Sequence, residues 1–215
     1  MSAPLPGAIL RRRPAGRKGR ARGRAGGDFV RLVKAHAIAY VAAMALRPIL
    51  IHPDPRLRKA AAPVGAVDAS IRALAEDMLA TMYDAPGIGL AATQLGIMKQ
   101  VFVMDTAAKE DERVPMVFLN PEIVWISDEE AESEEGCLSI PDIYETVTRP
   151  ARIRLRWMDL DGHVQEQDFA DRPAVCVQHE LDHLKGKLFI DYLSPVKRAM
   201  ITARMKKLKR ERARG

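Results

Sequence analysis

The chain has 215 residues, of which 47% are hydrophobic and 29% are charged. This length suits one globular domain with tails, and this composition excludes a wholly disordered chain. The formal charge of +6 is unevenly spread, because residues 1–45 carry +9, residues 46–194 carry −11 and residues 195–215 carry +8. Basic ends on an acidic body indicate a polyanionic partner that the ends contact.

Only two cysteines, Cys137 and Cys176, are present, and no secretory leader is recognisable, so we expect no disulfide framework. The longest apolar stretch, residues 29–46, is interrupted by Arg31, Lys34 and His36, which makes it a poor membrane span. We expect a monomer in the cytoplasm, with no membrane partner.

Residues 1–45 form a basic extension that we expect to be disordered, because a segment rich in Arg, Gly, Pro and Ala buries too little apolar surface. Two alternatives stay open. The extension could be an organelle transit peptide, although such peptides are rich in serine and Ser2 is its only serine. Alternatively, the working protein begins at Met44, and residues 1–43 are an upstream extension.

The first predicted helix begins after Asp68 or Ser70, either of which could cap it, and apolar residues then recur at helical spacing as far as Met82. Pro86 follows and ends the helix. Strand-like runs come next, separated by turn residues. They cover residues 100–105, 114–119, 122–125, 153–158 and 164–169.

A second helix is predicted over residues 172–185, closed by Gly186, and a third runs from Pro195 to near the C-terminus. Strands lying between helices of different roles predict an α+β fold. We expect a catalytic domain over residues 46–194 and a basic C-terminal helix over residues 195–215.

The strongest local motif is His179-Glu180-Leu181-Asp182-His183. Two histidines four residues apart project from one face of a helix, so both imidazoles can reach one ion while Glu180 handles protons beside it. This spacing is typical of a catalytic metal site. The alternative is a chance match between two surface or core histidines.

A catalytic metal site usually takes three protein ligands. Phe189 stands where metzincin proteases carry a third histidine, which excludes that subclass, and the only glutamate after His183 lies in the basic tail. Cys176 lies seven residues from His183, about 10 Å along the helix axis, so we expect it to be a small buried hydrophobe. Cys137, preceded by Gly136, which permits close backbone approach, is the better third ligand.

Three segments, taken in order, resemble the signature motifs of the peptide deformylase family. They are Gly87-Ile88-Gly89-Leu90-Ala91-Ala92-Thr93-Gln94, Glu135-Gly136-Cys137-Leu138-Ser139 and Gln178-His179-Glu180-Leu181-Asp182-His183-Leu184. The resemblance covers roughly residues 46–210. It implies small antiparallel or mixed sheets packed around a central HExxH helix, with a C-terminal helix. It also implies an enzyme that removes the formyl group from the starting methionine of nascent peptides and releases formate.

By this resemblance, one divalent ion is held by Cys137, His179 and His183. Ferrous iron is expected in the cell, with zinc, nickel or cobalt as alternatives, because a thiolate with two imidazoles suits several of these metals. Glu180 takes the proton of the attacking water and returns it to the departing amine. The Leu138 backbone N–H and the Gln94 side chain donate hydrogen bonds to the formyl oxygen.

The resemblance also implies substrate contacts. Gly87 and Gly89 allow an extended substrate backbone to pair closely with that of the enzyme. Ile88, Val175 and Cys176 are candidates for an apolar methionine pocket, although core packing is an alternative for Val175 and Cys176.

The chain departs from the family at Tyr144, where many relatives carry an arginine that helps to hold the substrate backbone. Arg149 and Arg152 are candidate substitutes, but we expect both to be surface charges.

Residues 195–215 combine periodic apolar residues with nine basic side chains, which predicts a basic amphipathic helix. Its charge and the resemblance suggest docking on ribosomal RNA and protein near the exit tunnel, with a salt-sensitive affinity. The alternative is a solvated helix packed on its own domain. For the whole protein, two other functions stay open: another HExxH metallopeptidase, or a ribosome- or RNA-binding protein with a structural metal.

Overall fold

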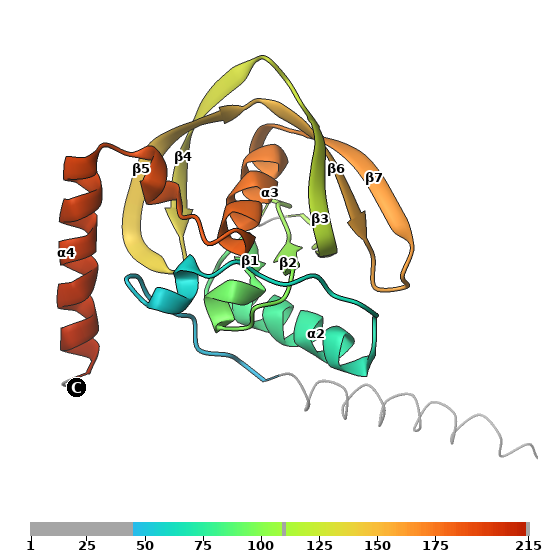
Figure 1. Ribbon diagram of the computed structural model, residues 1–215, viewed down its shortest axis with the longest axis horizontal. Helices are drawn as coiled ribbons and strands as arrows, with labels where there is room; N and C mark the ends of the chain where they lie inside the picture. The colour runs from blue at the N-terminus through green and yellow to red at the C-terminus, as the bar shows by residue number, and fades with distance from the viewer. Residues whose placement is uncertain (1–44, 109–110, 214–215) are drawn as a thin grey trace, which may run out of the picture. The chain divides into compact units, whose positions relative to one another are not determined.

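The computed structural model describes residues 45–108 and 111–213, so the expectations for the basic extension lie outside the described residues. Helices, antiparallel sheets and a C-terminal helix confirm the predicted α+β class (Figure 1). Within the described residues, no helix is both long and apolar enough to cross a membrane.

A five-stranded sheet forms the centre of the domain. Its strand order is β1-β2-β3-β6-β7 and every neighbouring pair is antiparallel. The strands are β1 (Gly89–Ala91), β2 (Val101–Met104), β3 (Met116–Ile126), β6 (Arg152–Met158) and β7 (Val164–Ala170).

The prediction of two separate strands within residues 114–125 is wrong, because β3 is continuous through this region. Asn120 adopts a positive φ of 50° and the register with β6 shifts between Leu119 and Glu122. The Asn120 side chain also bonds the Val64 backbone at both its N–H and its carbonyl. The strand therefore absorbs an irregularity instead of ending there.

Two further strands, β4 (Glu130–Cys137) and β5 (Ile140–Pro150), form a separate ribbon that the sequence did not predict. Most β4 side chains are polar and half of its residues are exposed, so no apolar alternation marks the strand. The ribbon turns at residues 138–139, and Cys137 is thereby placed at its tip.

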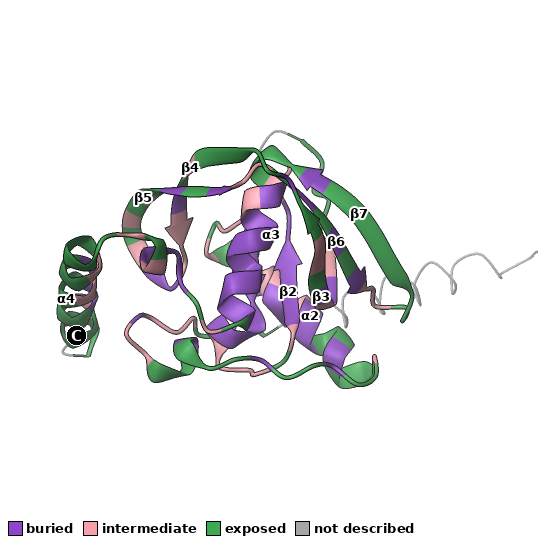
Figure 2. Cartoon of the chain, turned by 45° about the horizontal axis from the view of Figure 1, so that its top comes forward, coloured by how far each residue is buried: buried purple, intermediate pink, exposed green. Residues whose placement is uncertain are grey.

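Two helices cover opposite faces of the five-stranded sheet. Helix α2 (Ala69–Asp84) begins where the Asp68 side chain accepts a hydrogen bond from the Ile71 N–H, so Asp68 is the N-cap. It packs against Val101 and Val103, whereas α3 (Asp171–Leu184) packs against Phe102 on the other face. Figure 2 shows that α3 is buried along most of its length.

Helix α4 (Pro195–Arg212) follows the short helix η3 (Phe189–Tyr192). Ile201 and Met205 are buried in a third hydrophobic cluster that includes Phe189, whereas most other α4 side chains are exposed (Figure 2). One face of α4 is thus packed on the domain, and the basic face remains at the surface.

Candidate metal centre

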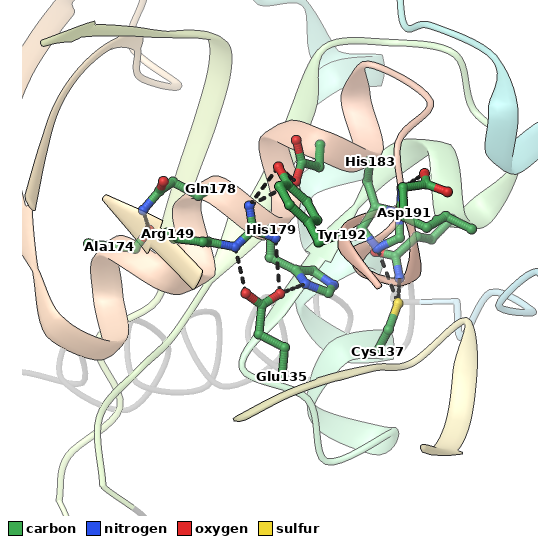
Figure 3. Close-up of polar contacts among 12 residues, drawn as sticks. Glu135, Cys137, Arg149, Ala174, Gln178, His179, His183, Asp191 and Tyr192 are labelled. Atoms are coloured by element: carbon green, nitrogen blue, oxygen red, sulfur yellow. Dashed lines mark hydrogen bonds and ion pairs between the residues drawn. The ribbon is translucent and has the colours of Figure 1, made fainter. Parts of the chain in front are cut away.

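Three side chains suited to hold a metal ion meet between the ribbon and α3. His179 and His183 project from one face of α3, and Cys137 reaches them from the tip of β4. Their candidate ligand atoms all lie within 4.8 Å of one another. Cys137 Sγ is 3.2 Å from His183 Nε2 (Figure 3).

The donor set fits a divalent ion. His179 Nδ1 lies 2.8 Å from Glu135 Oε2, and an N–H donated to this carboxylate leaves Nε2 available as a ligand. Burial lowers the pKa of His183 well below its usual value, and the neighbouring His179 lowers it further. A lower pKa favours the neutral imidazole, which is the form that binds metals, whereas hydrogen bonds to Cys137 and Glu135 outweigh burial and raise the pKa of His179.

Glu180 lies next to His179 in α3 and is only 4% exposed. Burial raises its pKa to about 7. Within the described residues, its Oε2 atom is buried and has no hydrogen-bond partner. The carboxylate is thus placed to exchange a proton near neutral pH.

Gln94 in η2 (Ala92–Leu95) is held in one orientation. Its Oε1 accepts a hydrogen bond from the Ala91 N–H at 2.8 Å, which turns the amide nitrogen the other way. Gln94 Nε2 lies 3.2 Å from Ser139 Oγ and 3.6 Å from Cys137 Sγ. Ser139 thus supports Gln94, a role that sequence reasoning missed because the two residues are 45 positions apart.

A cavity of about 810 Å³ opens beside these residues. All five predicted substrate-binding residues line it, as do three predicted metal or catalytic residues: Gly87, Ile88, Gly89, Val175 and Cys176, with Cys137, Leu138 and His179. Gln94, Glu180 and His183 are more deeply buried, at 1%, 4% and 1% exposure. Cys176 also belongs to the hydrophobic core, so it both lines the cavity and packs in the core.

The cavity glycines have a structural reason beyond close substrate approach. A Cβ on Gly89 would collide with Glu180 Oε1 and lie 2.8 Å from Cys176 Sγ. On Gly87 it would lie 2.7 Å from Leu138 Cδ1. Larger residues here would press on side chains of the site itself.

Arg149 is not a surface charge, so that prediction is wrong. The side chain is 3% exposed and bonds both carboxylate oxygens of Glu135, with Nη2 3.0 Å from Oε2. Its Nη1 lies 2.8 Å from Asp182 Oδ2. In contrast, Arg152 is exposed and pairs with Glu129, as expected of a surface charge.

Tyr144 is 66% exposed and lines the cavity. Its ring lies over Gly136, where a Cβ would come within 2.5 Å of the ring. Gly136 was expected to permit a close backbone approach, but the group that lies close to it is this aromatic side chain.

Residues 46–199 match the family model described as Polypeptide deformylase. The chain belongs to the peptide deformylase family. A peptide deformylase from Phenylobacterium zucineum is 52% identical over 164 residues, which are 76% of this chain and 97% of the relative.

Solved peptide deformylases agree with this assignment. The crystal structure from Legionella pneumophila has a TM-score of 0.74 and 46% identity, covering 80% of this chain and 99% of that one. The class I type b deformylase from Acinetobacter baumannii with Met-Ala-Ser bound has a TM-score of 0.66 and 35% identity, covering 70% and 99%. The protein is therefore a hydrolase of the N-formyl amide bond of nascent peptides. The comparisons favour this function over another HExxH metallopeptidase and over a ribosome- or RNA-binding protein with a structural metal. Peptide deformylases are metal-dependent, in keeping with the Cys/His/His cluster.

Proposed function

We propose that this deformylase holds one divalent ion through Cys137, His179 and His183, and that the ion in the cell is ferrous iron. The convergence of the three donors beside Glu180 carries the proposal. A thiolate with two imidazoles suits ferrous iron, zinc, nickel and cobalt, so metal analysis must distinguish them. When bound, such an ion makes water nucleophilic near neutral pH.

Glu180 is the general base and then the general acid. It accepts a proton at the unpartnered Oε2 atom as the water oxygen attacks the formyl carbon. It then donates this proton to the methionine nitrogen as the C–N bond breaks, giving formate and a free amine. A pKa of about 7 makes both protonation states accessible in one cycle.

Gln94 and Leu138 stabilise the negative charge that develops on the formyl oxygen. The Gln94 amide nitrogen already faces Cys137, because Ala91 fixes the other end of the amide. The Leu138 backbone N–H is the second donor, one residue after Cys137. Donors held in place before the reaction need not reorganise during it, and each contributes about 3 to 4 kcal/mol in other hydrolases.

The substrate methionine occupies the cavity beside Ile88, Val175 and Cys176, with its backbone along Gly87 and Gly89. All five residues line the cavity. The Acinetobacter baumannii relative with Met-Ala-Ser bound supports a short N-terminal peptide as the occupant.

The basic face of α4 docks on the ribosome near the exit tunnel. Exposed basic side chains supply the charge, and Val196 and Met200, at 70% and 68% exposure, supply apolar contact. A monomer in the cytoplasm, composed of a catalytic domain at 46–194 and a docking helix at 195–215, would place the cavity near emerging chains. The two unpaired cysteines suit such a reducing compartment.

The test is formate release, measured with formyl-Met-Ala-Ser and with Met-Ala-Ser after anaerobic purification and metal analysis. We expect formate only from the first peptide and about one iron per chain. Glu180→Gln should keep the metal and lose nearly all turnover, whereas Cys137→Ala should lose the metal. Full turnover in Glu180→Gln would contradict the mechanism, and a full metal complement in Cys137→Ala would contradict the ligand set.

A further inference from the structure

A continuous chain of polar contacts leads away from His179 on the side opposite Cys137. His179 Nδ1 bonds Glu135 Oε2, and Glu135 accepts two hydrogen bonds from Arg149 (Figure 3). Arg149 Nη1 then donates to Asp182 Oδ2 at 2.8 Å. The hydroxyl of Tyr192 donates to the same oxygen at 2.8 Å.

Burial matters most for the contacts between Glu135 and Arg149, whereas the Asp182 side chain is 13% exposed and Tyr192 is 42% exposed. The side chains of Glu135 and Arg149 are 2% and 3% exposed, so water cannot replace a lost partner. Glu135 accepts from Nε and Nη2 of the guanidinium, and the remaining nitrogen, Nη1, donates to Asp182 and, at 3.3 Å, to the Tyr192 hydroxyl. Both ends of the guanidinium are thus fixed by carboxylates.

The charges of Glu135, Arg149 and Asp182 favour a cation on the side of His179 that faces Cys137. Two carboxylates, Glu135 and Asp182, share the single guanidinium of Arg149, which leaves one excess negative charge. The excess charge lies behind a histidine whose other nitrogen faces Cys137.

The two residues at the outer end of this chain of polar contacts, Asp182 and Tyr192, come from different elements. Asp182 lies three residues after His179 in α3, and Tyr192 comes from η3 immediately before α4. The Tyr192 ring also contacts two cations, with Arg149 Cζ 4.7 Å and Lys187 Nζ 4.0 Å from its centre. Asp182 is therefore held from two sides.

We propose that Asp182 and Tyr192 are positioning residues for His179, acting through Arg149 and Glu135. By fixing the guanidinium they fix the carboxylate that orients the imidazole and selects its tautomer. The inference rests on the proposed role of His179 as a metal ligand. Neither residue is among those that line the cavity.

Cobalt(II) titration tests the inference without measuring turnover. Thiolate-bound cobalt absorbs in the near ultraviolet, and its visible bands report the geometry of the ligands. Asp182→Asn should bind cobalt about ten-fold more weakly than wild type and shift the visible bands, since supporting partners of ligating histidines typically contribute 10- to 100-fold in affinity. Tyr192→Phe keeps the ring and removes the hydroxyl, which donates to Asp182 and accepts from Arg149 Nη1, so about three-fold weaker binding is expected.

Asp168→Asn is the matched control, because Asp168 is an exposed carboxylate that accepts two hydrogen bonds from Arg154. It should bind cobalt like wild type. The double variant of Asp182 and Tyr192 should lose less affinity than the two single losses multiplied, because both residues contact the same Nη1 nitrogen of Arg149 and each other.

Wild-type affinity and spectrum in both single variants would overturn the inference, and should Asp182→Asn fail to fold, Tyr192→Phe decides alone. Failure of the metal centre itself is distinguishable from these outcomes. In that case the wild-type protein would not bind cobalt, or Cys137→Ala would bind it equally well.

Discussion

Gly89 packs directly against the carboxylate of Glu180, with no room between them for a methyl group. Gly89→Ala should therefore displace Glu180 while leaving the ligand residues unchanged. We expect turnover to fall about 100-fold, because misplacing a catalytic group by about 1 Å has an effect of this size. Steady-state formate release and metal content together check this.

Gly65→Ala is the control for that substitution, since a Cβ on Gly65 meets no atom within 4 Å. It should have wild-type turnover. If Gly89→Ala retained both full turnover and full metal content, Glu180 would tolerate movement and its placement would not limit the reaction.

Arg149 and Arg152 offer a test of burial at nearly adjacent positions. Arg149→Met leaves Glu135 and Asp182 without their shared cation inside the protein, so we expect the free energy of unfolding to fall by about 3 to 5 kcal/mol. Arg152→Met removes only an exposed pair and should change it by less than about 0.5 kcal/mol. Equilibrium urea unfolding measures both, and equal losses would contradict the distinction.

The exposed face of α4 can be tested without disturbing its packing. Lys207→Gln combined with Arg210→Gln leaves Ile201 and Met205 in place. Co-sedimentation with ribosomes should weaken, and the logarithmic salt dependence should decrease by about two, one for each lost phosphate contact. Arg154→Gln combined with Arg156→Gln removes the same charge from β6 and should bind like wild type. Unchanged binding by the α4 variant would contradict docking through this face.

His52 makes stability depend on pH. It is 5% exposed, and its Nε2 lies 2.9 Å from Thr202 Oγ1 on α4. Burial lowers its pKa to about 4; Arg58, Lys206 and Lys209 add to this shift, and Asp191 opposes it. The unfolded chain has a histidine pKa of about 6.5, so protonation favours unfolding.

The contribution of His52 is therefore complete above about pH 6.5 and is lost as the pH falls towards about 4. Urea unfolding at pH 7, 5 and 4 should show a steeper loss for wild type than for His52→Gln. His163→Gln, which removes an exposed histidine, should follow wild type. Parallel curves for wild type and His52→Gln would contradict a linked protonation.

Local signals in the sequence predicted much of the fold. The apolar periodicity of α2 and its Asp68 cap lie within a few residues of one another, so the sequence alone was sufficient. The end of α3 was predicted from Gly186, which adopts a φ of +73°. The acidic strand β4 was missed because the ribbon buries few of its side chains.

The histidine pair followed from helical spacing, and Cys137 from the shortage of other donors. Other features of the site depend on contacts between segments that are distant in the sequence, and local sequence patterns do not show such contacts. The partners of buried Arg149, Glu135 and Asp182, lie 14 and 33 residues away in the sequence. No local pattern around Arg149 therefore indicates either contact. These long-range contacts explain why Arg149, which was predicted to be a surface charge, is buried beside the metal centre.

The donors of the candidate centre come from segments far apart in the chain, since Cys137 and His183 are separated by 46 residues. An ion held by both would close this long loop and act as a cross-link between the β4–β5 ribbon and α3. Loop closure removes conformational freedom from the unfolded chain, so loading with metal would also fasten the fold. The same three ligands would then contribute both to the stability of the folded state and to deformylation.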